Sequence, residues 1–133
     1  MAALLALDDQ FLKKQDLGST NIRGVVTLSG VFDLTMADTV AASVFSTNDV
    51  ARRAASPLFH VSNSKSTPPF LITYCQWDYV PLAGQARRFY RELKEAGVAA
   101  ALHFTPKENH ISEVIALTHD GDATAKALIG FLK

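Results

Sequence analysis

Three apolar runs, each bounded by polar or turn-forming residues, place the strongest limit on the fold of this chain. They are IRGVVTLSG (residues 22–30), FLITYC (70–75) and VAAALHF (98–104). Apolar residues follow one another in these runs instead of alternating with polar ones, so each run predicts a strand buried on both faces. Such strands occur mainly in parallel sheets whose two faces are covered by helices.

Segments with a helical period separate or flank these runs. A helix is predicted over 81–96 because its apolar residues fall on one helical face: Leu82, Ala86, Phe89, Tyr90 and Leu93. Residues 122–133 predict a last amphipathic helix, with Asp120 or Asp122 as its cap. Residues 1–14 resemble the end of a helix, because no capping residue precedes them. Alternating strands and helices predict the α/β class, with about three parallel strands flanked by helices.

Length and composition limit the function classes. A chain of 133 residues with 48% hydrophobic and 20% charged residues predicts a single soluble domain. Thirteen basic and thirteen acidic residues cancel, so nothing favours binding to nucleic acid or to an anionic membrane. No apolar run is long enough to span a bilayer, and MAALLAL lacks the basic residues of a signal peptide. A single cysteine, Cys75, excludes an internal disulfide, and we expect a cytoplasmic location.

Two polar loops follow neighbouring predicted strands. QWDYVP, after the strand at 70–75, contains Asp78, and TPKENH, after the strand at 98–104, contains His110. Active groups of open parallel sheets lie at the carboxyl ends of the strands, so these two side chains can meet. An aspartate paired with a histidine ring fixes its tautomer and stabilises the imidazolium during proton transfer. The alternative role for Asp78 is that of a turn or helix cap before Pro81.

The remaining candidate groups favour ordinary structural roles. His60 follows SPLF and is expected to pack or bond locally, His103 lies within a strand, and His119 lies in a polar loop. No pair of histidines has metal-ligand spacing with a third donor, and no glycine-rich phosphate loop is present, so we expect no metal and no cofactor. Cys75 lies inside an apolar strand, where a thiol is more often part of the core than a nucleophile.

Several segments together resemble the C-terminal half of α/β-hydrolases, in the esterase, lipase and arylformamidase-like branch. They are IRGVVTLSGVFDL, ASPLFHVS, PPFLITYCQWDYVP, ARRFYRELKEAGVAAALHF and NHISEV, and they cover nearly the whole chain in the order of that family. The resemblance implies a partial α/β-hydrolase fold over residues 1–133, in which 36–66 is a variable, cap-like segment. It implies that Asp78 is the acid and His110 the base of a catalytic triad.

The same resemblance implies a carboxylesterase-like serine hydrolase that cleaves a small ester or amide without a cofactor. Trp77 and Tyr79, beside the acid, are candidate walls of the substrate pocket. Phe59 is a further candidate, although packing in the core is the more usual role for such a residue.

The sequence departs from the family at the nucleophile. The family's serine lies in a Gly-x-Ser-x-Gly elbow between a strand and a helix, and the helix resembles MAALLAL, so the elbow is expected before Met1. The loop that donates to the oxyanion is missing as well. Ser29 has Thr27 where the first glycine belongs, and Ser19 precedes a strand. YCQWD also lacks the glycine that relatives usually carry before the acid.

Two functions follow from these departures. The chain is either part of a serine hydrolase that is inactive alone, or a non-catalytic domain that acts in self-association or partner binding. In the parent fold the strand at Val25 to Leu28 is interior, so its outer edge is expected to be unpaired here, with only 122–133 on one face of the sheet. We therefore expect a homo-oligomer with Val25, Val26 and Leu28 at or near the contact.

Overall fold

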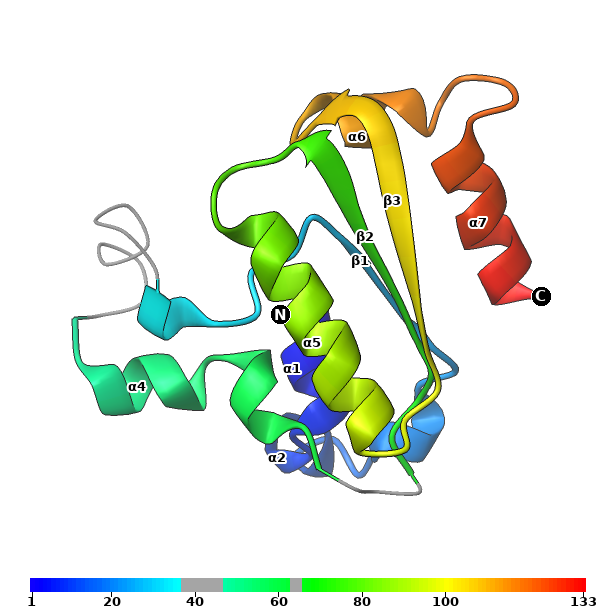
Figure 1. Cartoon of the computed structure of the whole chain (residues 1–133). Helices are drawn as coiled ribbons and strands as arrows, with labels where there is room; N and C mark the ends of the chain where they lie inside the picture. Colours follow the sequence, from blue (N-terminus) through cyan, green and yellow to red (C-terminus); the bar gives the residue numbers. More distant parts are fainter. Residues whose placement is uncertain (37–46, 63–65) are drawn as a thin grey trace.

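The computed structural model describes residues 1–36, 47–62 and 66–133 (Figure 1). Within these residues, three strands form one parallel sheet in the order β1 (Val25–Leu28), β2 (Phe70–Trp77) and β3 (Ala100–Asn109). The described helices are α1 (Ala2–Leu7), α2 (Gln10–Lys13), α4 (Asp49–Ala54), α5 (Leu82–Glu95), α6 (Ser112–Ala116) and α7 (Ala123–Leu132). Short 3₁₀ helices are η1 (Ser19–Asn21), η2 (Leu34–Met36) and η3 (Pro57–His60). The predicted α/β class is confirmed.

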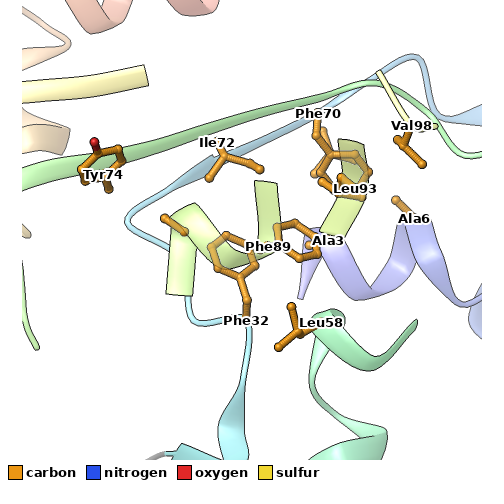
Figure 2. Close-up of a cluster of buried hydrophobic side chains, with 12 residues drawn as sticks. Ala3, Ala6, Phe32, Leu58, Phe70, Ile72, Tyr74, Phe89, Leu93 and Val98 are labelled. Atoms are coloured by element: carbon orange, nitrogen blue, oxygen red, sulfur yellow. The ribbon is translucent and has the colours of Figure 1, made fainter. Parts of the chain in front are cut away.

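One hydrophobic core fills the space between the sheet and the helices α1 and α5 (Figure 2). Phe89 of α5 stacks on Phe32, with ring centroids 4.3 Å apart, and meets Phe70 of β2 edge-on at 5.6 Å. Ala3 and Ala6 of α1 complete this side of the core. The early helix and α5 therefore lie on the same face of the sheet, as right-handed crossovers require.

The opposite face carries the alternate side chains of the strands. Helix α7 packs there against β3 and β2. Its Phe131 lies over Gly24, where an added Cβ would come within 2.9 Å of the aromatic ring. A second helix, α6, also reaches this face through the buried side chain of Glu113. The prediction that only residues 122–133 cover this face is therefore wrong. The sequence does not predict α6, because a helix of five residues is too short to show a periodic pattern.

The predicted strand at 98–104 differs from β3 at both ends. The strand begins at Ala100 and continues to Asn109, and its pairing with β2 shifts register between Cys75 and Trp77. The additional residues, TPKEN, are polar and resemble a loop, but Thr105 and Asn109 still pair with Cys75 and Trp77 of β2. Lys107 has a φ of 63° within this stretch, which accompanies the irregularity. The extension carries the chain to His110.

The N-terminal segment contains two helices where the pattern over residues 1–14 predicts one. Asp8 is extended, with φ −124° and ψ 104°, and it ends α1. Its carboxylate accepts a hydrogen bond from the backbone N–H of Gln10 at 3.0 Å. Such a local bond from an aspartate competes with the helical backbone bonds, which explains the break.

The segment predicted to be cap-like, 36–66, is described only in part, because residues 37–46 and 63–65 lie outside the described residues. The described part contains α4 and η3. The side chain of Asn48 caps α4 by accepting from Val50 N at 2.9 Å and Ala51 N at 3.2 Å. None of the helices within the described ranges is both long and apolar enough to cross a membrane.

Candidate active site

Asp78 lies directly after the last residue of β2, at the carboxyl end of the sheet. Its side chain is almost completely buried, with 1% of its surface exposed. One carboxylate oxygen, Oδ1, accepts a hydrogen bond from the backbone N–H of Tyr79 at 2.9 Å. The other oxygen, Oδ2, is buried and has no hydrogen-bond partner among the described residues. The contacts of Oδ1 therefore determine how this carboxylate is oriented.

His110 lies directly after β3, between the strand and α6. The preceding residue, Asn109, bonds to the start of this helix: its Oδ1 accepts from Ile111 N at 2.9 Å and from Ser112 N at 3.0 Å. In return, the Ser112 hydroxyl oxygen accepts from Asn109 N at 2.8 Å. These reciprocal bonds hold both ends of the short connection, so the backbone at His110 is well defined.

The structure brings these two side chains together, as their positions after neighbouring strands predict. The Nδ1 atom of His110 lies 2.9 Å from Oδ1 of Asp78. A carboxylate only accepts, so in a neutral ring the proton lies on Nδ1 and Nε2 is left as an acceptor. No side chain in the described part of the molecule bonds to Nε2, and 32% of the His110 side chain is exposed. This geometry suits a group that accepts a proton from an external donor.

Trp77 and Tyr79 border the pair on the Asp78 side. The Tyr79 ring lies against the His110 ring, with centroids 4.9 Å apart and planes inclined at 50°. Trp77 pairs in the sheet with Asn109, the residue before His110. Both aromatic side chains are largely exposed, and so are Val80 and Ile111. The exposed surface beside the pair is therefore apolar and aromatic.

Cys75 lies on β2 and is a free, buried thiol. Burial raises its pKa, and the negative charges of Asp78 and Glu113 raise it further, although a hydrogen bond with Ser29 acts in the opposite direction. A raised pKa keeps the thiol protonated and weakly nucleophilic. The expectation that Cys75 belongs to the core agrees with this environment.

The other candidates lie in ordinary structural contacts. His60 Nε2 bonds to the backbone oxygen of Ala54 at 2.8 Å, and His103 Nε2 lies 3.2 Å from the Thr124 hydroxyl. The Phe59 ring has the Arg53 guanidinium 4.0 Å from its centroid. In the ranges that the structure describes, no group of three or more His, Cys, Asp or Glu side chains could hold a metal ion.

Sequence patterns do not identify one buried residue near the pair, Glu113. It is 0% exposed and accepts hydrogen bonds from the hydroxyls of Ser29 at 2.6 Å, Thr73 at 2.6 Å and Thr105 at 3.1 Å. In the sequence, Glu113 resembles a solvent-exposed residue of a polar loop. The one signal for it is its position three residues after His110, about one helical turn further along the chain.

Comparisons with known proteins agree with this fold. Residues 21–132 match the prolyl oligopeptidase family, Peptidase_S9. Carboxyl esterase 2 of the fungus Tuber melanosporum superposes with a TM-score of 0.65 at 24% identity, over 97% of this chain and 46% of that one. The Pyrobaculum calidifontis esterase superposes with a TM-score of 0.65 at 20% identity, over 96% of this chain and 46% of that one. Esterase 2 of Thermogutta terrifontis superposes with a TM-score of 0.60 at 18% identity, over 89% of this chain and 41% of that one.

These solved structures show that the fold is that of α/β-hydrolases, and the chain spans less than half of the length of each. No curated protein sequence matches the chain. The resemblance of the sequence to α/β-hydrolases is thereby confirmed. The family match extends from η1 through α7 and includes the whole sheet with Asp78 and His110. The chain belongs to the prolyl oligopeptidase family.

Proposed function

We propose that this chain supplies the acid and the base of a serine hydrolase that cleaves a small ester or amide. The observation that carries the proposal is the 2.9 Å contact between His110 and Asp78 at the carboxyl ends of adjacent parallel strands. In this role Asp78 orients the ring and stabilises the imidazolium. His110 takes the serine proton on Nε2 and returns it to the leaving group.

We place the nucleophile outside these 133 residues. The sequence contains no Gly-x-Ser-x-Gly elbow, and two serines at this end of the sheet, Ser29 and Ser112, have other partners. The Ser29 hydroxyl donates to Glu113, and the Ser112 hydroxyl oxygen accepts from the backbone N–H of Asn109. A serine that served His110 would need its hydroxyl within hydrogen-bond reach of Nε2.

Trp77 and Tyr79 are proposed to contact the substrate, because both are exposed beside the base. The names of the three similar structures favour an ester as substrate, and the name of the family favours a peptide. Both reactions proceed through a tetrahedral intermediate and need the same acid and base. No cofactor takes part in such a reaction. The reduced, buried Cys75 is compatible with the cytoplasmic location that we propose.

The location of the nucleophile is tested by treating the purified chain with a fluorophosphonate probe and a nitrophenyl ester. We expect no covalent adduct in the intact mass, and no ester turnover above that of the His110→Ala variant. A serine without an activating base and an oxyanion site does not react at a useful rate. Stoichiometric labelling of Ser29 or of any other serine would show that the nucleophile lies within this chain.

A second candidate is a non-catalytic domain that acts in self-association or partner binding. It is favoured by the position of β1, which pairs with β2 on one side and has no strand on its other side within the described residues. Exposed edges of this kind pair readily with another strand. The corresponding proposal is a homo-oligomer that forms through Val25–Leu28, without contact with nucleic acid or membrane.

A further inference from the structure

Glu113 is a buried carboxylate without a cationic partner among the described residues. A charged group removed from water is stable only when hydrogen-bond donors replace the lost hydration. Here the donors are three hydroxyls: Oε2 accepts from Ser29, and Oε1 accepts from Thr73 and Thr105. The bonds from Ser29 and Thr73 each measure 2.6 Å, as is usual for a hydroxyl that donates to a charged oxygen.

The three donors come from all three strands of the sheet. Thr73 lies in β2, Thr105 lies in β3, and Ser29 directly follows β1. Ser29 has a φ of 44°, in the left-handed region that residues with a side chain rarely adopt. Such a conformation persists where surrounding contacts maintain it, and the bond to Glu113 is one of these contacts. A single side chain of α6 thus connects this helix to every strand, at the same end of the sheet as Asp78.

The hydrogen bonds continue from this carboxylate to α7. Thr105 Oγ1 lies 2.9 Å from Thr124 Oγ1, which lies 3.2 Å from Nε2 of His103. Each hydroxyl has one proton to donate, and Thr105 uses its proton for Glu113. Thr124 must then donate to Thr105, and Nε2 of His103 must donate to Thr124. The carboxylate therefore sets the direction of every bond in this network.

His110 lies one helical turn before Glu113, and the two are joined by the start of α6, where Asn109 Oδ1 accepts from Ser112 N. The position of this helix determines the position of the His110 ring. We propose that Glu113 is a positioning residue, which anchors α6 to the three strands and so keeps His110 Nδ1 within hydrogen-bond distance of Asp78. Its importance for catalysis rests on the proposed function, but its effect on the ring can be measured in the chain alone.

The test is the tautomer of His110, measured by NMR of the ring nitrogens at alkaline pH, where an ordinary imidazole is neutral. In the unmodified chain we expect the proton on Nδ1. Glu113→Ala removes all three hydrogen bonds, so we expect loss of the single Nδ1–H form and the appearance of both tautomers. Glu113→Gln should keep the Nδ1–H form, because an amide can accept from both threonines and donate to Ser29.

Gln85→Leu is the matched control. Gln85 is also buried and accepts from the backbone N–H groups of Phe32 and Asp33 at 2.8 Å, but it lies on α5, on the other face of the sheet. This variant should leave the His110 tautomer unchanged. If Glu113→Ala does not fold, the double variant Thr73→Val/Thr105→Val replaces it, because valine retains the shape and removes both donors to Oε1. We expect the Nε2–H form of His110 to rise in this variant.

An unchanged tautomer in a folded Glu113→Ala or double variant would overturn the positioning role. A Glu113→Gln variant that loses the Nδ1–H form would also overturn it, since the bonds and not the charge are proposed to act. These results differ from a failure of the proposed function. If the acid–base assignment itself failed, the unmodified chain would lack the Nδ1–H form, whatever residue 113 is.

Discussion

The Cys75 thiol lies on β2 between Thr73, which binds Glu113, and Asp78, which binds His110. Its raised pKa is due first to burial, and the nearby carboxylates add to the effect. Two negative charges close to a thiol disfavour the thiolate. At the scale of single residues, this environment therefore disfavours the thiolate form of Cys75 and with it a nucleophilic role.

This environment predicts how Cys75 responds to pH. The pKa of Cys75 is higher in the folded chain than in the unfolded one, so the folded chain prefers the protonated thiol. This preference stabilises the folded state fully below the ordinary thiol pKa of about 8.5, and the stabilisation is lost as pH rises through the pKa of the folded chain. We expect the free energy of unfolding in urea to decline above that ordinary value, and the decline to be smaller in Cys75→Ala. A thiol reagent should modify the native chain much more slowly than the unfolded chain. Equal rates in both states would contradict the burial of this thiol.

The sequence predicts Asp78 and His110 because each follows an apolar strand, and the ends of neighbouring parallel strands lie close together. Glu113 could not be predicted in the same way. Its three partners are Ser29, Thr73 and Thr105, which are far apart in the sequence and come together only when the sheet forms. Hydroxyl residues within apolar strands carry no pattern that identifies a common acceptor.

At the scale of elements, the agreement between sequence and structure follows the length of each periodic pattern. The helix expected at 81–96 is α5 at Leu82–Glu95, and the helix expected at 122–133 is α7, capped by Asp122. The five-residue α6 shows no period, and the polar end of β3 resembles a loop. The sequence predicts neither, because backbone pairing and the hydrogen bonds of Asn109, not apolar periodicity, define them.

Helix α5 gives the prediction for the core. Phe89→Ala removes a ring that is 0% exposed and contacts Phe32 and Phe70, so we expect unfolding to become easier by about 3–5 kcal/mol. Arg91→Ala is the control on the same helix, because its ion pair with Glu95 is exposed and contributes about 0.5 kcal/mol or less. Urea unfolding followed by circular dichroism compares the two variants. A Phe89→Ala cost close to that of Arg91→Ala would mean that the core is not packed as described.

At the scale of the whole molecule, the alternation of apolar runs and helical periods predicts the order of strands and helices. The same pattern does not determine how copies of the chain assemble. Val25 N–H donates to Pro69 and Ser29 N–H donates to Thr73, both toward β2. Since successive residues of a strand point their backbone groups to opposite sides, Val26 and Leu28 direct theirs outward. This edge is the proposed contact between copies of the chain.

Light scattering at micromolar concentration should therefore detect a dimer or a larger species. Val26→Pro removes one outward N–H and leaves the bonds to β2 in place, so this variant should shift the chain toward the monomer. Val26→Ile retains the N–H and serves as the control, with no shift expected. A stable monomer in the unmodified chain would contradict the proposed homo-oligomer.

The central claim is that Asp78 holds His110 with its proton on Nδ1, which leaves Nε2 as the base. The most direct measurement is NMR of the His110 ring nitrogens at alkaline pH in the unmodified chain and in Asp78→Ala, with Asp120→Ala as the control for loss of an exposed aspartate. We predict the Nδ1–H tautomer in the unmodified chain and the control, and a mixture of both tautomers in Asp78→Ala. An Nε2–H tautomer in the unmodified chain, or a spectrum that Asp78→Ala leaves unchanged, would contradict the acid–base assignment.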